Sequence, residues 1–324
     1  MPDERISDLG EFGLIGEIAR IAGHSNAIAG IGDDAAVLEL PEGEVMLATV
    51  DMLVEDVHFR QSYMSAEEIG ATALAVNISD IAAMGGTPRY ALVSLAASPH
   101  TSVDLIRGLM TGLVSVGKRF GVSLAGGNVT STKGPLTIDV VMIGSAKRDE
   151  VVLRSGARPG DVIAVTGRLG ARAAFRMSRE AELESAPTFR VPVPRVEIGR
   201  RLAARHLAHA MIDLSDGLAG DIKHVCQASG VGAVLYETAL PTADEARRMA
   251  SALGTSAAEL ALGGGEDYEL LICLDSGDLE AARSIAVEVG LTVVGLILDA
   301  SSGVLLEDAS GGGKALTSEG WEHF

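Results

Sequence analysis

Hydrophobic and polar residues follow two periods along the first half of the chain, and each period predicts one kind of element. The helical period predicts helices over residues 9–22, 66–84 and 104–120. Runs with the composition of strands are VMLATV, which leads into Asp51, RYALVSLAA and PLTIDVVMIG. Because the helices do not alternate regularly with parallel strands, we expect an α+β domain with a mostly antiparallel sheet and helices on one side.

A polar segment, AKRDEVVLRSGARPGD, separates this half from the next. It predicts a boundary between two domains, residues 1–147 and 148–324. Beyond it, the strand-like runs DVIAVTG, HAMIDLS, GAVLYE, YELLICL and LTVVGLIL alternate with helical stretches near 170–183, 195–206, 217–229 and 278–290. This alternation predicts an α/β domain, and the prolines of SAPTFRVPVPR predict an extended loop between two of its helices.

Charge excludes one large class of partner. The 324-residue chain has a formal net charge of −18 and a pI near 4.8. Such a surplus of carboxylates opposes binding to nucleic acid, which rewards clustered Lys and Arg. The acidic residues either hold divalent cations that neutralise a small anionic substrate or form a solvated surface, and the second explanation accounts for most of the Glu residues.

The cysteines and the N-terminus indicate the compartment. Cys226 and Cys273 form neither a disulfide framework nor a thiolate zinc motif, so we expect both in the core. The first ten residues lack the apolar segment of a signal peptide, and no run approaches the ~20 apolar residues that span a bilayer. We therefore expect a cytoplasmic protein with no membrane partner.

Acidic residues of the first half lie where strands and helices end. In VNISD, Asn77 and Asp80 are three residues apart and share one face of an otherwise apolar helix. A metal site and a hydrogen-bonded Asp at a helix contact are about equally good explanations of Asp80. The remaining polar residues come from GIGDDAAVL and from the strand VMLATVDMLVEDVHF, namely Asp33, Asp34, Thr49, Asp51, Asp56 and His58. The carboxylate and hydroxyl oxygens among them suit Mg²⁺, although a lone Asp pair is more often an ordinary turn. His58 is either a core or capping histidine or a phosphate contact.

In the second half, MIDLSDGLAGDI runs from an apolar strand into a helix and places Asp213, Ser215 and Asp216 at the junction. Free N–H groups at a helix N-terminus favour a phosphate, and the two Asp side chains can hold the cation that bridges its oxygens. A plain N-cap is the alternative, because Ser and Asp are preferred caps without any ligand.

Two glycine-rich stretches, LAGGNVTS at 124–131 and LGGGEDYELL at 262–271, let the backbone approach a ligand closely. Neither matches a P-loop or a GxGxxG fingerprint, so the common nucleotide-binding folds are not supported. Glu266 and Asp267 in the second stretch could also simply close a turn.

Eight motifs in order carry a resemblance to a known family: GIGDDAAVL, TVDMLVEDVHF, ALAVNISDIAAMGG, AGGNVT, VLRSGARPGD, IDLSDGL, GGGEDYEL and the terminal GWEHF. Over essentially the whole chain the sequence resembles the thiamine-monophosphate kinases. Other members of the wider superfamily, which includes aminoimidazole ribonucleotide synthetase, selenophosphate synthetase and a hydrogenase maturation factor, match less well. Selenophosphate synthetases carry a reactive Cys or selenocysteine near the N-terminus and the hydrogenase factor a C-terminal Cys, whereas this chain ends in Glu322, His323 and Phe324.

The resemblance implies Mg²⁺-dependent, in-line transfer of the γ-phosphoryl group of ATP to thiamine monophosphate, which yields thiamine diphosphate. It further implies an N-terminal domain that binds ATP and metal and forms a homodimer through a shared β-barrel. The implied metal ligands are Asp34, Thr49, Asp51, Asp80, Asp213 and Asp216; the ATP contacts are Gly127, Asn128, Arg154 and Ser215; the acceptor contacts are His58, Glu266 and Trp321.

This sequence departs from the family pattern at two positions. Asn128 stands where many members have Asp, which changes the count of metal ligands, and Val50 replaces a hydroxyl residue of some relatives. No residue is assigned as a general base, and Trp321 either stacks on the acceptor ring or packs onto the core. Two other functions stay open at this point: an ATP-using relative with another acceptor, and an acidic metal-binding protein without enzymatic activity.

Overall fold

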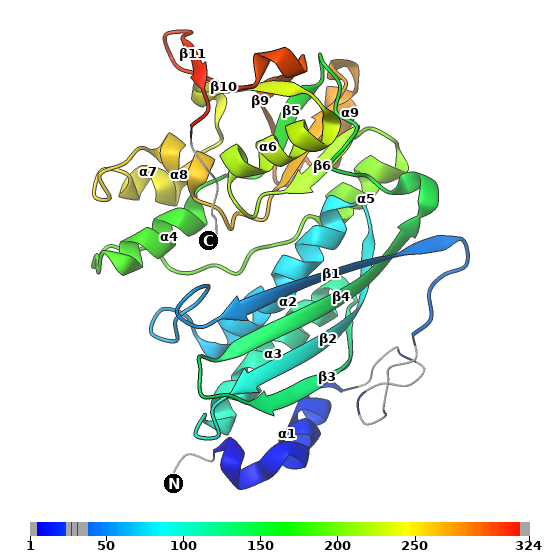
Figure 1. Ribbon diagram of the computed structural model, residues 1–324, viewed down its shortest axis with the longest axis vertical. Helices are drawn as coiled ribbons and strands as arrows, with labels where there is room; N and C mark the ends of the chain where they lie inside the picture. The colour runs from blue at the N-terminus through cyan, green and yellow to red at the C-terminus, as the bar shows by residue number, and fades with distance from the viewer. Residues whose placement is uncertain (1–4, 24–26, 28–30, 32–37, 318–324) are drawn as a thin grey trace. The chain divides into compact units, whose positions relative to one another are not determined.

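The computed structural model describes residues 5–23, 27, 31 and 38–317. The chain divides into two compact units (Figure 1). Unit 1 consists of Met1–Ile81 and Gly86–Arg148, and unit 2 of Ala82–Gly85 and Asp149–Phe324.

Unit 1 contains a four-stranded sheet and three helices. Its elements are α1 (Ile6–Ala22), β1 (Glu44–Val54), α2 (Ala66–Ala83), β2 (Thr87–Ala97), α3 (Val103–Phe120), β3 (Ser123–Ser131) and β4 (Thr137–Lys147). The strand order is β1-β4-β2-β3, in which β4 pairs antiparallel with both neighbours and β2 pairs parallel with β3. The sheet is thus mixed, and the expected mostly antiparallel sheet is confirmed only in part.

Helices α2 and α3 lie behind the sheet in the view of Figure 1. Strand residues alternate in burial, so that Leu47 and Leu53 of β1 are buried while Met46 and Met52 are exposed. The two helices approach each other closely, because a Cβ at Gly70 would overlap the backbone of Leu109. This side of the sheet is therefore a packed core, which agrees with the expectation of helices on one side.

Unit 2 is built on a seven-stranded sheet of order β11-β10-β7-β9-β5-β8-β6. All neighbouring pairs are antiparallel except β10 with β7. The strands are β5 (Val162–Thr166), β6 (Ala210–Asp213), β7 (Gly232–Tyr236), β8 (Leu270–Leu274), β9 (Leu291–Leu298), β10 (Val304–Glu307) and β11 (Gly313–Ala315). The alternation of strands and helices along the sequence therefore does not produce a parallel sheet here.

Helices cover both faces of this sheet. The helices of unit 2 are α4 (Ala171–Glu180), α5 (Val196–Ala204), α6 (Leu218–Ser229), α7 (Asp244–Met249), α8 (Ala257–Gly263) and α9 (Leu279–Ile285). The buried side chains of α6 pack with Ile163 and Ile212 in one hydrophobic core. Those of α5 and α9 pack with Ala164 and Met211 in a second core. Single 3₁₀ turns lie at Arg148–Glu150, Glu237–Ala239, Ser276–Asp278 and Ala300–Ser302.

Most predicted elements are present, with some differences in extent. Helix α1 includes a non-helical Gly10 with φ 69°, and the helix expected over 278–290 ends at Ile285. The proline-rich segment 185–195 has no helix or strand, as expected. Sequence reasoning missed the helices α7 and α8 and the strands β3, β10 and β11.

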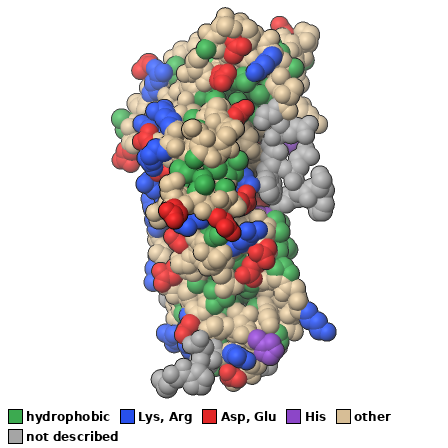
Figure 2. Space-filling model, turned by 90° about the vertical axis from the view of Figure 1, so that its left-hand side faces the viewer, with side chains coloured by type: hydrophobic (Ala, Val, Ile, Leu, Met, Phe, Trp, Pro, Cys, Tyr) green, Lys and Arg blue, Asp and Glu red, His purple; other side chains and the backbone are tan. Residues whose placement is uncertain are grey.

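Two surface properties bear on the expected partners. Within the described part of the chain, no helix is long and apolar enough to cross a membrane. On the face shown in Figure 2, acidic side chains are interspersed with Lys and Arg rather than gathered in one patch.

Candidate functional site

A polar cluster interrupts the apolar contact between β1 and α2 in unit 1. The Thr49 hydroxyl donates a hydrogen bond to Asp80 Oδ2 (2.6 Å), and the Asp51 N–H donates to Asn77 Oδ1 (3.0 Å). Asn77 is fully buried and is held in turn by a bond from its Nδ2 to the Ala73 carbonyl (3.0 Å). The structure therefore brings together Thr49, Asp51 and Asp80, which come from two elements.

His58 lies in the turn that follows β1. Its Nδ1 accepts a hydrogen bond from the Val54 N–H (3.1 Å), and its own N–H donates to the Val54 carbonyl (2.9 Å). Because Nδ1 acts as an acceptor, the neutral ring carries its proton on Nε2. The fold thus fixes the tautomer of a half-buried histidine close to the cluster on β1.

The first glycine-rich stretch is part of β3 and not a loop. A Cβ at Gly127 would overlap the Val93 carbonyl oxygen, so this glycine permits the parallel pairing of β3 with β2. Asn128 pairs with Ser94, which places it on the face of the sheet away from the helices, whereas Asp51 pairs with the buried Val140 on the helix side. Within unit 1, Asn128 therefore does not join the cluster on β1. Its contact with ATP stays a prediction.

Three residues of the implied site, Asp33, Asp34 and Trp321, lie outside the described residues.

In unit 2 the junction of β6 and α6 holds a second acidic cluster. Asp213 ends β6 and is buried, and Ser215 and Asp216 follow in the turn before α6. Gly217 has φ 100°, and a Cβ there would lie 2.8 Å from the Leu262 carbonyl oxygen. A glycine is thus required for the turn to pack against the end of α8.

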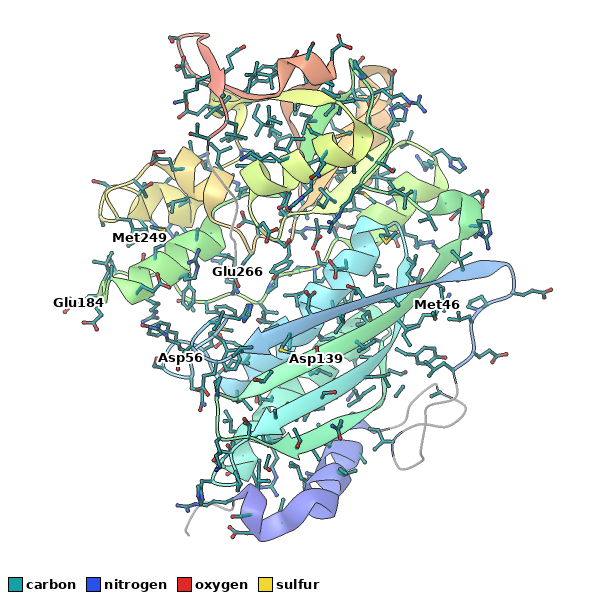
Figure 3. All side chains as sticks on the ribbon, in the orientation of Figure 1. Met46, Asp56, Asp139, Glu184, Met249 and Glu266 are labelled. Carbon is teal, nitrogen blue, oxygen red and sulfur yellow. The ribbon has the colours of Figure 1, made fainter. Side chains whose placement is uncertain are left out.

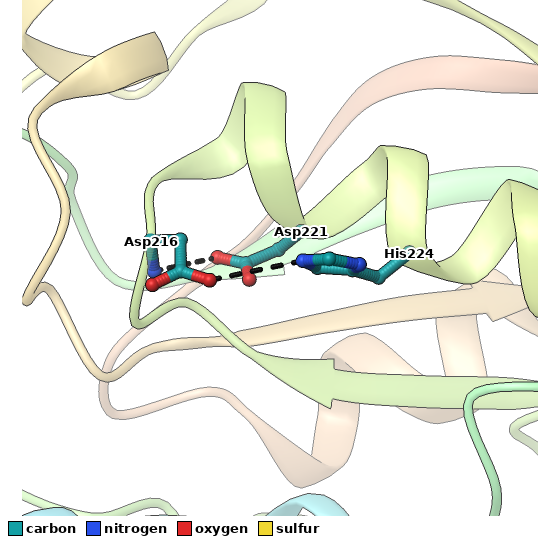
Figure 4. Close-up of side chains that lie close together, drawn as sticks. All are labelled: Asp216, Asp221 and His224. Atoms are coloured by element: carbon teal, nitrogen blue, oxygen red, sulfur yellow. Dashed lines mark hydrogen bonds and ion pairs between the residues drawn. The ribbon is translucent and has the colours of Figure 1, made fainter. Parts of the chain in front are cut away.

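Asp221 and His224 of α6 complete this cluster (Figure 4). Asp221 accepts a hydrogen bond from the Asp216 N–H (3.3 Å), and His224 Nε2 lies 3.7 Å from Asp216 Oδ2. One ligand atom from each of the three side chains lies within 4.8 Å of the others. Sequence reasoning missed both residues, although their spacing of three on a helix that follows the Asp216 turn was a usable signal.

The electrostatics of this cluster favour a cation. Burial, and then the carboxylates of Asp216 and Asp213, raise the pKa of Asp221 well above its usual value, against the opposing effects of the Asp216 N–H and of Arg154. Arg154 is exposed, and its carbonyl accepts a hydrogen bond from the Ser229 hydroxyl (3.3 Å). A divalent cation would relieve the repulsion between these carboxylates, and the oxygen donors of both clusters are those that Mg²⁺ prefers.

The second glycine-rich stretch lies directly against the Asp216 turn. The Glu266 N–H donates to the Ser215 carbonyl (2.7 Å), and the Tyr268 N–H donates to the Leu214 carbonyl (2.8 Å). A Cβ at Gly265 would lie 2.8 Å from the Ser215 carbonyl oxygen. The sequence motifs IDLSDGL and GGGEDYEL therefore form one continuous surface in unit 2.

Asp267, in the same stretch, is half-buried and accepts hydrogen bonds from the Gly170 N–H at both carboxylate oxygens (2.9 and 2.8 Å). Burial raises the pKa of Asp267 to about 8, with smaller opposing effects from the Gly170 N–H and from Arg172, and further upward effects from Glu269 and Glu266. Because Gly170 is 97 residues away in the chain, this contact joins the stretch to the start of α4 and does not close a local turn.

The raised pKa predicts a pH dependence of stability. Between pH 4 and pH 8 the folded chain retains a proton that the unfolded chain releases, so the stabilisation is complete below the unfolded pKa and is lost as pH rises to about 8. Over this interval the free energy of unfolding of Asp267→Asn should fall with rising pH less steeply than that of the wild type. The two slopes should differ by up to about 1 kcal/mol per pH unit. Urea unfolding at pH 5, 6, 7 and 8 measures the difference, and equal slopes in both proteins would contradict it.

Comparison with known proteins places these features in a family. Residues 32–146 match the model of the AIR synthase related protein, N-terminal domain, and residues 158–306 match that of its C-terminal domain. A thiamine-monophosphate kinase of Bacillus subtilis (strain 168) is 35% identical over 97% of this chain and 99% of the relative. The chain belongs to the thiamine-monophosphate kinase family. A second member, from Aquifex aeolicus (strain VF5), is 32% identical over 99% of this chain and 100% of its own length.

Solved structures agree with this family membership. A thiamine-monophosphate kinase of Stenotrophomonas maltophilia K279a covers 91% of this chain and 95% of its own, with 34% identity and a TM-score of 0.79. The structure of AaThiL complexed with AMPPCP and TMP covers 100% of both chains, with 31% identity and a TM-score of 0.77. The hydrogenase maturation protein HypE in complex with ATP, at 22% identity and a TM-score of 0.80, shares the fold.

Proposed function

We propose that this protein transfers the γ-phosphoryl group of ATP to thiamine monophosphate, with Mg²⁺, and releases thiamine diphosphate and ADP. The observation that carries the proposal is the relative that holds AMPPCP and TMP and matches this chain over its entire length. The packing of the Asp216 turn against the Glu266 loop supports it, since it brings carboxylates of two separate motifs together within unit 2.

The chemistry of the acceptor explains why no general base is needed. A phosphate monoester has a second pKa of about 6 and is therefore largely a dianion at neutral pH. The difficulty of the reaction is the approach of two anions, which requires charge neutralisation and alignment. We accordingly assign no residue of this chain as the base. His58, with its proton on Nε2, donates a hydrogen bond to an oxygen of the thiamine monophosphate.

We propose the following roles for the residues of each unit taken by itself. In unit 1, Thr49, Asp51 and Asp80 supply oxygen ligands to Mg²⁺, as does Asp34; in unit 2, Asp213 and Asp216 do so. When bound, Mg²⁺ neutralises phosphate charge and orients the phosphoryl group. Gly127, Asn128, Arg154 and Ser215 contact ATP, and His58, Glu266 and Trp321 contact the acceptor.

Glu266 has a defined part in this assignment. A carboxylate repels the acceptor phosphate, so Glu266 contacts the positively charged thiazolium ring or the amino group of the pyrimidine. Its side chain is 26% exposed and is thus accessible to a ligand.

We also propose that two copies associate through the uncovered face of the unit 1 sheet and form the shared barrel. Strand β1 exposes Met46, Val50 and Met52 by 60, 58 and 52% on that face (Met46 and Asp139 of the neighbouring β4 are labelled in Figure 3). A row of exposed apolar side chains is typical of an interaction surface. Sedimentation equilibrium should give twice the mass of one chain, and the mass of a single chain would rule this association out. The cytoplasmic location stays a prediction.

The test of the function is an acceptor panel. The purified chain is incubated with ATP and Mg²⁺ together with thiamine monophosphate, thiamine or an unrelated phosphate monoester, and ADP release is followed. We expect release with thiamine monophosphate only, and none after removal of Mg²⁺ by chelation. Release with a different acceptor would indicate another reaction of the superfamily, and absence of turnover with every acceptor would remove the enzymatic proposal.

A further inference from the structure

The segment Gly263–Tyr268, here called the acceptor loop, has an unusual backbone. Gly265, Glu266 and Tyr268 have φ values of 69°, 60° and 51°. For residues with a side chain, such as Glu266 and Tyr268, this conformation is strained, and it persists only where the surroundings enforce it. Contacts from outside the loop therefore hold it in this conformation.

The N-terminal part of α4 contacts three parts of the acceptor loop. The Gly170 N–H, at the start of the helix, donates to the Asp267 carboxylate (2.8 and 2.9 Å). Arg172 Nη2 lies 3.5 Å from Glu266 Oε1, and one turn later Arg176 Nη2 donates to the Gly264 carbonyl (3.1 Å). Positions four apart lie on one face of a helix, so both arginines face the loop together.

Arg172 is the unusual member of this set. It is only 8% exposed, and its Nε and Nη1 are buried without a hydrogen-bond partner among the residues that the structure describes. Its guanidinium lies over the ring of Phe189 (4.3 Å), which packs edge to face against Phe175 (5.1 Å between ring centroids). A buried cation with unused donors is costly, so its retention calls for a role other than packing.

The ion pair explains that role. The contact between Arg172 and Glu266 joins Nη2 of the guanidinium and Oε1 of the carboxylate (3.5 Å). The side chain of Glu266 is 26% exposed while Arg172 is sealed beneath it (Glu266 is labelled in Figure 3). The guanidinium therefore directs the Glu266 carboxylate by their ion pair, without itself being accessible to a ligand.

We propose that Arg172 and Arg176 are positioning residues, which hold the acceptor loop in its strained conformation and direct Glu266 to the cationic part of the acceptor. This inference rests on the proposed function for the identity of the acceptor, but the contacts with the loop do not depend on it. Arg172 and Arg176 thereby determine the affinity for the acceptor and leave that for ATP unchanged.

The test compares Arg172→Met, Arg172→Lys and a matched control, Arg179→Met. Arg179 lies on the same helix, and its guanidinium covers the ring of Phe175 (5.7 Å) and not the acceptor loop. We expect Arg172→Met to raise KM for thiamine monophosphate by about 10–50-fold, because the loss of one ion pair to a buried charge weakens binding by about one to two factors of ten. KM for ATP should stay within about twofold of the wild-type value. Arg172→Lys should recover part of the loss, and Arg179→Met should match the wild type.

A second measurement separates this inference from the proposed function. Amide hydrogen exchange at Glu266 and Tyr268, whose N–H groups bond to Ser215 and Leu214, is read without any substrate. We expect faster exchange in Arg172→Met and no change in Arg179→Met. A wild type that makes no thiamine diphosphate would defeat the proposed function alone. Unchanged exchange in Arg172→Met, or an equal rise of KM for both substrates, would overturn the positioning role.

Discussion

Asp80→Asn is expected to lower kcat for thiamine diphosphate formation by at least about 100-fold, because it removes a charge that the proposed Mg²⁺ site requires. Asparagine has nearly the same size as aspartate, and its Oδ1 can still accept the hydrogen bond from Thr49 that is now 2.6 Å long. The contact between β1 and α2 is therefore preserved while the charge is lost. Steady-state rates at several Mg²⁺ concentrations measure the effect, and higher Mg²⁺ should restore part of it.

Asp104→Asn provides the matched control. Asp104 lies in the first turn of α3 in the same unit, is 74% exposed and pairs with Arg107 (2.9 Å). Its replacement should change kcat by less than about twofold, because exposed ion pairs contribute little. If Asp80→Asn retained wild-type kcat with an unchanged Mg²⁺ dependence, the assignment of Asp80 as a metal ligand would be wrong.

The second large effect concerns stability. Arg195, at the end of the proline-rich segment, donates from Nε to Glu269 Oε2 (2.7 Å) and from Nη2 to Oε1. Thr166 donates to the same carboxylate (2.6 Å) and accepts from the Leu270 N–H (2.9 Å). Since Glu269 is only 6% exposed, Arg195→Ala leaves a buried carboxylate without its cation. We expect the free energy of unfolding of unit 2 to fall by about 3–5 kcal/mol, as measured by urea unfolding at pH 7.

Two further variants make this prediction specific. Arg283→Ala breaks an exposed pair with Glu280 (2.7 Å) whose partners are 45 and 81% exposed, and it should cost less than about 0.5 kcal/mol. The double variant Arg195→Met/Glu269→Leu should recover much of the stability lost in Arg195→Ala, because no uncompensated charge is then buried. A double variant as unstable as Arg195→Ala would show that the stabilisation arises from packing and not from charge.

Local patterns in the sequence predicted most of the individual elements. The helices α2, α3 and α6 and the strands β5 and β8 are long or strongly apolar, so that the period alone identifies them. Helices of six and seven residues, α7 and α8, are too short to establish a period, and β11 has only three residues. These elements are defined by tertiary contacts, which the sequence pattern does not contain.

Sheet topology required information that local patterns lack. The stretch 124–131 suggested a phosphate-binding loop, yet Gly127 is needed for close parallel pairing of β3 with β2. In unit 2, helices between strands suggested an α/β domain. Most neighbouring strands of its sheet nevertheless run antiparallel. Strand partners far apart in sequence depend on which faces pack together, and the alternation of element types alone does not specify this.

The candidate site was predictable in part for the same reason. Thr49, Asp51 and Asp80 were identified from residue type and position, and the structure brings them together. Arg172 and Arg195 were not identified, because their partners Glu266 and Glu269 lie more than 70 residues away in the chain. An arginine on a helix reads as a surface residue until its long-range partner is known.

The most direct test of the central claim follows the phosphoryl group itself. ATP labelled with ³²P at the γ position is mixed with the purified chain, Mg²⁺ and thiamine monophosphate, and the products are separated. The account predicts label in the terminal phosphate of thiamine diphosphate, with one ADP formed for each labelled product. Label that appeared in inorganic phosphate, with thiamine monophosphate unchanged while ATP is consumed, would contradict it.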